Sequence, residues 1–208
     1  MNRDFVLLSD IVPDVIQEIR YYSTYNFIGD RIEGYDEPCA ILTRKAALAL
    51  REVSDDLAAQ GLRIKVFDAY RPERAVRHFI RWAEDEDDLR MKKYFYPDVN
   101  KKDLFEIGYI CRKSSHCRGS TVDMTLFDMK TGREVSMGSP FDYFGKRSHT
   151  DFLKHLTDEE IENRFFLRDT MVNHGFTTLN EEWWHFTLAD EPFPDTYFDF
   201  PVRKTEVE

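Results

Sequence analysis

Apolar residues recur at three- and four-residue intervals in three segments of the chain, which is the spacing of one face of an α-helix. The first segment follows Thr43 and ends at Gly61, a residue suited to closing a helix. The second follows Pro72, whose missing N–H suits a first helical turn. The third follows Thr157, which forms a capping-box pattern with Glu160. We therefore predict three amphipathic helices.

Other segments alternate apolar and polar side chains, as β-strands do. The turn residues at 130–132 separate two of them and predict a hairpin. Because strands and helices do not alternate strictly, we expect an α+β fold with a mostly antiparallel central sheet flanked by helices. The predicted strands span residues 62–69, 121–127, 134–137, 176–179 and 184–188.

The composition is that of a folded chain of moderate size. Of its 208 residues, 42% are hydrophobic and 14% aromatic, which is typical of globular proteins and excludes a disordered chain. A chain of this length can hold one core, and no repeat, low-complexity tract or linker divides it. We therefore predict one domain over residues 1–208.

The net charge of −10 and the isoelectric point of about 5.1 oppose binding to nucleic acid and anionic membranes. We expect neither partner, and a small molecule as ligand. The apolar run near the N-terminus is too short for a signal peptide or a membrane span, which predicts a cytoplasmic protein. Cys39, Cys111 and Cys117 lack C-x-x-C spacing and are expected to be reduced thiols. The oligomeric state stays open, a homo-oligomer included.

Two histidines and one aspartate offer the donors of a catalytic zinc site. Such sites usually take three ligands from His, Asp or Glu and keep one position open for water. His116, Asp123 and His185 satisfy that count, which predicts one Zn²⁺ per chain. Gly119 can supply the turn that folds the first two toward one ion. Taken singly, each motif is more often a satisfied core histidine or an edge strand than a metal site.

Together the two motifs resemble a known family of zinc peptidases. Residues 114–123, SSHCRGSTVD, resemble the S-x-H-x-x-G-x-A-x-D signature of the D-alanyl-D-alanine carboxypeptidase and dipeptidase clan. Residues 182–185, EWWH, resemble its E-x-W-H signature. Thr121 replaces the alanine of the first signature, for which we expect at most local repacking. Further segments resemble the dipeptidase branch associated with vancomycin resistance, namely residues 20–22, 26–29, 68–72, 137–142 and 197–201. The likeness therefore spans nearly the whole chain.

The resemblance implies that Glu182 is the general base, a carboxylate outside the metal that takes a proton from water and passes it to the leaving amine. Glu181 is the competitor, because in a regular strand Glu181 would share the face of His185 and Glu182 would not. The family pattern matches Glu182 and therefore requires a turn or bulge before Trp183.

Arg71 is implied as the group that stabilises the oxyanion. Its alternative role is a structural ion pair with Asp68 or Glu73 at the start of the second helix.

The same resemblance places a small pocket for both ends of a dipeptide. Asp142 would meet the ammonium, with Tyr21 nearby, and Ser114 and Ser115 would face the carboxylate. Each has a plainer alternative, Asp142 as a turn residue and the serines as loop residues that bond the backbone.

The resemblance thus implies a zinc-dependent D-alanyl-D-alanine dipeptidase that yields two D-alanines through a zinc-activated water. One alternative is a carboxypeptidase that trims peptidoglycan stem peptides. Another, from a different class, is an inactive zinc fold that serves as a binding module. Vancomycin resistance and turnover of wall-derived dipeptide both fit the activity. We expect the aromatic segment 193–201 to pack on the chain's own core.

Overall fold

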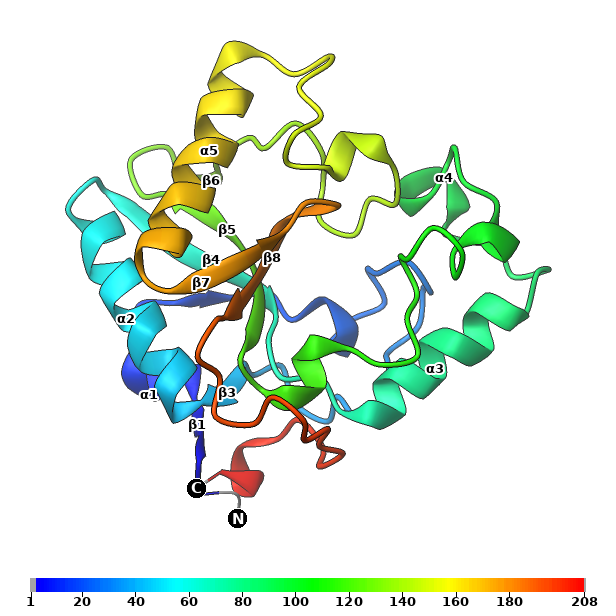
Figure 1. The fold of residues 1–208 in the computed structure, drawn as a ribbon, viewed down its shortest axis with the longest axis horizontal. Helices are drawn as coiled ribbons and strands as arrows, with labels where there is room; N and C mark the ends of the chain where they lie inside the picture. The colour runs from blue at the N-terminus through cyan, green and yellow to red at the C-terminus, as the bar shows by residue number, and fades with distance from the viewer. Residues whose placement is uncertain (1–2, 208) are drawn as a thin grey trace.

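A six-stranded sheet forms the centre of the structure, a computed structural model that describes residues 3–207 (Figure 1). Its strands are β2 (Ile16–Gln17), β4 (Leu62–Asp68), β5 (Thr121–Asp128), β6 (Arg133–Glu134), β7 (Phe176–Leu179) and β8 (Glu182–Leu188). Their order is β2-β4-β5-β8-β7, with β6 paired to the far end of β5. The β2–β4 pair is parallel and the other pairs of this sheet are antiparallel. The predicted α+β class with a mostly antiparallel sheet is confirmed. A smaller sheet pairs β1 (Phe5–Leu7) with β3 (Ile41–Thr43).

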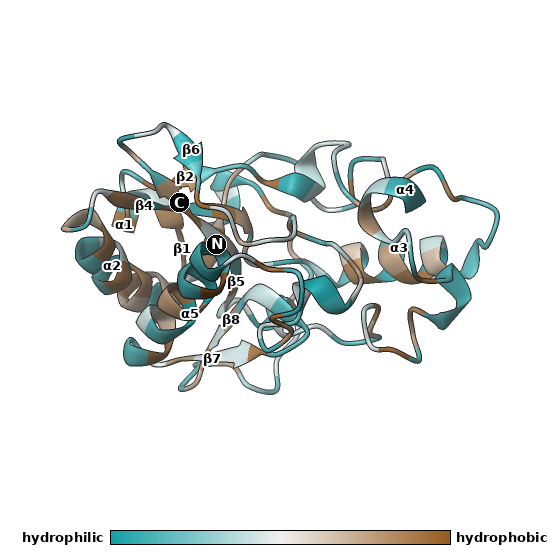
Figure 2. Ribbon diagram, turned by 90° about the horizontal axis from the view of Figure 1, so that it is seen from above, coloured by the Kyte–Doolittle hydropathy of each residue, from teal (hydrophilic) through white to brown (hydrophobic). Residues whose placement is uncertain are grey.

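The helices divide between two sides of the molecule. They are α1 (Leu8–Ile11), α2 (Arg44–Ala58), α3 (Glu73–Glu84), α4 (Lys92–Phe95) and α5 (Asp158–Asn173). Figures 1 and 2 place α2 and α5 with the sheet, and α3 and α4 on the opposite side of the molecule. That opposite side is completed by two long irregular segments, residues 85–113 and 138–156, which we call the loop wall. Its two segments contact each other, since the Phe144 N–H donates to the Phe95 carbonyl (2.7 Å) and Tyr109 stacks on Phe144.

The helix starts follow the sequence signals. The Thr43 hydroxyl accepts from the Ala46 N–H (3.4 Å) at the start of α2. Both bonds of the predicted capping box are present at α5, with Thr157 Oγ1 accepting from the Glu160 N–H (3.2 Å) and Glu160 Oε2 accepting from the Thr157 N–H (2.9 Å). α3 begins directly after Pro72. Each cap satisfies N–H groups that have no partner within the helix.

The predicted return strand over residues 134–137 is wrong in extent, because β6 is only two residues long. The chain leaves the sheet after β6 because side chains of α5 donate hydrogen bonds to backbone carbonyls of residues 136 and 137. Asn163 Nδ2 donates to the Ser136 carbonyl (3.0 Å) and Arg164 Nε to the Met137 carbonyl (2.5 Å). The opposite error occurs at β8, which begins two residues earlier than predicted.

The C-terminal aromatic segment packs on the chain's own core, as predicted. Phe193, Phe198 and Phe200 surround the buried ring of Phe5. The Phe198 N–H also donates to the Cys117 carbonyl (2.9 Å), so this segment braces the turn that carries His116. In residues 3–207, none of the helices combines the length and apolar character that a membrane crossing requires.

Candidate active site

Cross-strand pairing brings two of the three predicted metal ligands together. Asp123 in β5 and His185 in β8 are direct antiparallel partners, so their side chains leave the sheet on the same face. His116 reaches them from the short 3₁₀ segment Ser115–Arg118. Gly119 ends that segment in the left-handed region (φ 81°), and a Cβ there would lie 2.1 Å from the Phe5 ring. This position therefore requires glycine.

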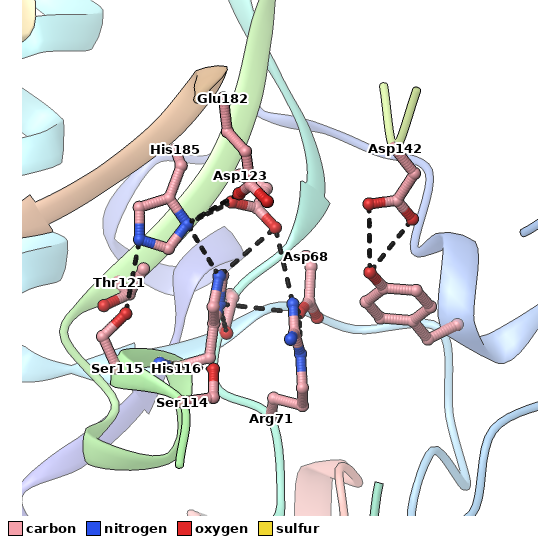
Figure 3. Close-up of polar contacts among 12 residues, drawn as sticks. Asp68, Arg71, Ser114, Ser115, His116, Thr121, Asp123, Asp142, Glu182 and His185 are labelled. Atoms are coloured by element: carbon pink, nitrogen blue, oxygen red, sulfur yellow. Dashed lines mark hydrogen bonds and ion pairs between the residues drawn. The ribbon is translucent and has the colours of Figure 1, made fainter. Parts of the chain in front are cut away.

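The donor atoms of these three residues converge on one point (Figure 3). His116 Nε2 lies 3.3 Å from His185 Nδ1 and 3.3 Å from Asp123 Oδ2, and His185 Nδ1 lies 3.1 Å from Asp123 Oδ1. All three ligand atoms are within 4.8 Å of one another. Two imidazoles and one carboxylate form the donor set of a catalytic zinc site, which leaves a fourth position open. The residues therefore fit Zn²⁺.

The second nitrogen of each ring is held by a neighbouring group. His116 Nδ1 lies 2.7 Å from the Ala69 carbonyl, which can only accept, so Nδ1 carries the proton and Nε2 keeps its lone pair. His185 Nε2 lies 3.3 Å from the Ser115 hydroxyl, which leaves Nδ1 facing the other two donors. Such outer contacts orient metal-binding histidines.

Burial and charge shift the pKa values of these groups in different directions. Burial alone would lower the pKa of His185, but its hydrogen bond to Asp123 and the charge of that carboxylate outweigh burial and raise it. Burial lowers the pKa of His116, which favours the neutral imidazole. Burial alone would raise the pKa of Asp123, but His116 and His185 outweigh it and lower that pKa, so the carboxylate is ionised.

Glu182 faces the same point, and Glu181 does not. Glu182 Oε2 lies 3.5 Å from His185 Nδ1, while Glu181 is exposed outside the cavity. The pairing of β7 with β8 shifts register across the stretch from Glu182 to Phe186, which is the kind of bulge that the sequence pattern required. Burial raises the pKa of Glu182 to about 7. A carboxylate with such a pKa can take up and return a proton near neutral pH.

Arg71 combines the two roles that the sequence left open. Its guanidinium pairs with Asp68 (Nη2 to Oδ2, 2.9 Å), and also lies 3.6 Å from Asp123 Oδ2 and lines the cavity. Its Cζ atom lies over the ring of Tyr21, 5.0 Å from the centroid. The ion pair with Asp68 therefore holds the Arg71 guanidinium at the cavity, where its charge can act on a substrate.

The sequence interpretation named Asp68 only as a structural ion-pair partner of Arg71, and it missed Tyr35. Asp68 is fully buried, accepts from Tyr35 Oη (2.6 Å) and Arg71 Nε (2.9 Å), and lies 3.5 Å from His116 Nδ1. Burial raises the pKa of Asp68 against the lowering effect of Arg71. The available signal was an aspartate that directly follows the apolar pair Val66 and Phe67 at the end of a predicted strand, where an ionised group needs a partner.

Asp142 lies on the side of the site away from the two histidines (Figure 3), and Tyr21 lines the same cavity. Tyr21 Oη donates to Asp142 Oδ2 (3.0 Å). Asp142 is 5% exposed and adopts a left-handed φ of 60°, so it is a turn residue as well as a cavity residue. Burial, with Asp123 and Glu182 adding to it, raises the pKa of Asp142 well above its usual range. A cation placed here would relieve that cost.

The two predicted serines and Thr121 have different surroundings. Ser114 Oγ accepts from the His116 N–H (3.3 Å) and caps the 3₁₀ segment, which is its plainer alternative, yet it also lines the cavity. Ser115 lines the cavity beside His185. Thr121 is buried and its hydroxyl pairs with that of Thr187 across the strands (2.9 Å).

The cavity that these residues enclose has a volume of about 230 Å³. Several of its lining residues are aromatic or aliphatic and come from α3 and the loop wall: Phe79, Tyr109, Ile110 and Phe144. These residues belong to no motif, and the sequence interpretation missed them. Cys117, which follows His116, is buried and does not belong to the converging set of donors, and burial raises the pKa of its thiol to about 12.

Known proteins resemble this chain along nearly its full length. Residues 1–203 match the M15 peptidase family described as D-Ala-D-Ala dipeptidase. A D-alanyl-D-alanine dipeptidase of Enterococcus faecalis is 42% identical over 97% of this chain and 100% of that protein. Dipeptidases of the same name from Enterococcus faecium and Streptomyces coelicolor are 38% and 36% identical over 98% and 97% of this chain, each aligned over 100% of its length.

Proposed function

The chain belongs to the M15 family of D-Ala-D-Ala dipeptidases, and from this membership we propose that it is a zinc-dependent dipeptidase that hydrolyses D-alanyl-D-alanine to two D-alanines. One observation carries the proposal. Three convergent metal donors, a partly buried carboxylate with a raised pKa and a partly buried arginine line a single small cavity. A structural metal site has no use for the last two groups, so this combination favours an enzyme over an inactive binding module.

Each charged group has a task in hydrolysis. His116, Asp123 and His185 would hold Zn²⁺, which would supply Lewis acidity and lower the pKa of a bound water. Glu182, beside this set, accepts the proton of the attacking water and returns it to the leaving amine. Arg71, fixed by Asp68, presents a permanent positive charge to the oxygen that becomes negative.

The cavity selects a substrate with two charged ends. Asp142, oriented by Tyr21, receives the ammonium, which supplies the cation that this buried carboxyl otherwise lacks. Ser114 and Ser115 offer hydroxyl protons to the carboxylate, because a serine oxygen that accepts one bond can still donate another.

The physiological setting is proposed from the chemistry of the substrate. Hydrolysis of D-Ala-D-Ala removes the dipeptide that ends peptidoglycan stem peptides, which serves vancomycin resistance or the turnover of wall-derived dipeptide. The thiols of Cys39, Cys111 and Cys117 are free, and Cys111 is exposed. These thiols support a cytoplasmic location, since that compartment keeps thiols reduced.

The test measures amine release by the zinc-loaded protein from D-Ala-D-Ala, L-Ala-L-Ala and a pentapeptide that ends in D-Ala-D-Ala. We expect cleavage of the D,D-dipeptide alone. Cleavage of the pentapeptide would instead identify a carboxypeptidase. Bound zinc without cleavage of any of the three would favour a binding module.

A further inference from the structure

A second cavity of about 670 Å³ lies beside the catalytic one in the loop wall. It is lined by apolar side chains, with charged groups among them: Asp98, Val99, Ile107, Lys146, Phe152 and Glu181 are among its residues. Tyr109 lines both cavities. The two spaces are therefore neighbours, with the Tyr109 side chain between them.

The partition is one residue thick along three separate segments of the chain. Phe144 lines the catalytic cavity, while Tyr143 and Gly145 on either side of it line the second cavity. Glu182 lines the first and Glu181 the second, and likewise Gly108 lines the first and Ile107 the second. Where three segments alternate sides in this way, little more than the side chains themselves separates the two spaces.

Tyr109 is held in the partition by one contact to its ring and another to its hydroxyl group. Its ring stacks on Phe144 with centroids 5.0 Å apart and planes inclined by 18°. Its hydroxyl lies 3.3 Å from His149 Nε2, a residue of the second cavity. The side chain is thus fixed at its body and at its tip, although it belongs to a segment without regular secondary structure.

The partition includes the residue that follows Asp142, the proposed ammonium site. Asp142 lines the catalytic cavity, and the next residue, Tyr143, already lines the second. A peptide extended at its amino end would have to pass this point. We propose that Tyr109 is a specificity-determining residue whose ring closes the amino-side end of the catalytic cavity and limits cleavage to dipeptides. This inference rests on the proposed dipeptidase function.

The second cavity would accept the extension once the partition is opened. Its apolar residues suit the aliphatic part of an acyl or aminoacyl group, and the charged groups around them suit a peptide's polar atoms. The occupant in an opened variant is therefore the amino-side extension of an N-acylated D-Ala-D-Ala peptide.

The experiment replaces Tyr109 by Leu and by Ala in the zinc-loaded protein. Cleavage of D-Ala-D-Ala, N-acetyl-D-Ala-D-Ala and Nα-acetyl-L-Lys-D-Ala-D-Ala is measured for each variant. The ratio of kcat/KM for the extended peptides to that for the dipeptide should rise by about tenfold or more in Tyr109→Ala, and less in Tyr109→Leu, as space is added in steps. Tyr109→Phe, which keeps the ring, should still exclude the extended peptides.

The matched control is Phe152→Ala, which enlarges the second cavity but leaves the partition intact. It should not gain activity on extended peptides. A gain in Phe152→Ala equal to that in Tyr109→Ala would overturn the role of the partition, as would folded, zinc-containing Tyr109→Leu and Tyr109→Ala proteins with the wild-type ratio.

A binding measurement separates this inference from the proposed function. Titration calorimetry with N-acetyl-D-Ala-D-Ala should show tighter binding to Tyr109→Ala than to the wild type, whether or not cleavage follows. Loss of the proposed function would appear as a wild type that leaves D-Ala-D-Ala intact. Failure of the partition would appear as equal affinities in this titration.

Discussion

The strands and the loop wall position the site by different means. Asp123 and His185 are placed by the hydrogen-bonded register of β5 and β8, which sets both their separation and the face on which they emerge. Asp142 and Tyr109 lie in irregular segments and are placed by side-chain contacts. Tyr21 contacts Asp142, and Phe144 contacts Tyr109. The groups assigned to the chemistry therefore lie mostly on the rigid sheet, and those assigned to substrate selection on loops. Changes to the first should abolish turnover, whereas changes to the second should redirect it.

The largest effect on kcat is expected for a change at Glu182, the proposed base in β8. Glu182→Gln removes the proposed base with little change in shape and should lower kcat by about 10²- to 10⁴-fold while zinc stays bound. Amine release and zinc content would be measured together. Glu181→Gln is the matched control, because Glu181 lies one residue away but outside the cavity. Inactivity of that control beside an active Glu182→Gln would transfer the role to Glu181.

A smaller loss of kcat is expected for a change at Asp68, the residue at the end of β4 that pairs with Arg71. Asp68→Asn keeps the shape but removes the charge that pairs with Arg71, and should lower kcat by about 10- to 100-fold, the equivalent of one charge-assisted hydrogen bond. Tyr35→Phe removes only the bond to Asp68 and should cost less. The readouts are kcat and KM separately, since misplacement of Arg71 acts on kcat. An effect on KM alone would contradict this positioning role.

Zinc removal should loosen the two regions unequally. Zinc at a hundredfold excess over its dissociation constant stabilises the folded state by about 2.7 kcal/mol, which for a chain of this length raises Tm by about 5–10 °C. Chelation should reverse that shift. Hydrogen exchange should then increase at β5, β8 and the Ser115–Arg118 segment more than in the loop wall. Equal increases in both regions would argue against a site built on the strands.

The smallest effect is expected outside both regions, in the C-terminal segment. Asp199 accepts from the Arg74 N–H (2.7 Å) and from Arg77 Nη2 (2.7 Å) at the start of α3. Burial raises the pKa of Asp199, but these hydrogen bonds outweigh it and lower the pKa. Because the folded-state pKa lies below the unfolded one, this stabilisation is present above about pH 4 and is lost as the pH falls further.

Asp199→Asn should therefore lower the stability by about 1 kcal/mol or less at pH 7, and the difference should shrink toward pH 3. Urea unfolding at several pH values measures it, with kcat at pH 7 expected to stay near that of the wild type. A stability difference that grows at low pH would contradict the assigned ion pairs.

Local signals predicted much of the fold. The caps at Thr43 and Thr157 and the helix start after Pro72 depend on groups within a few residues of one another, and all three were placed correctly. The return strand at 134–137 was not, because Asn163 and Arg164 of a distant helix compete for its carbonyls. Such competition leaves no trace in the strand's own pattern.

The sequence by itself determined the donor types, the glycine turn beside His116 and, through its likeness to a peptidase family, the residues expected to form the site. Only the tertiary structure decided that Glu182 rather than Glu181 faces the cavity, that Arg71 is held by Asp68, and where the cavity ends. The physical reason is the range of the interactions. Caps and turns depend on neighbours in the chain, whereas a strand register, a bulge and a partition of loop side chains arise from contacts between residues that lie far apart in it.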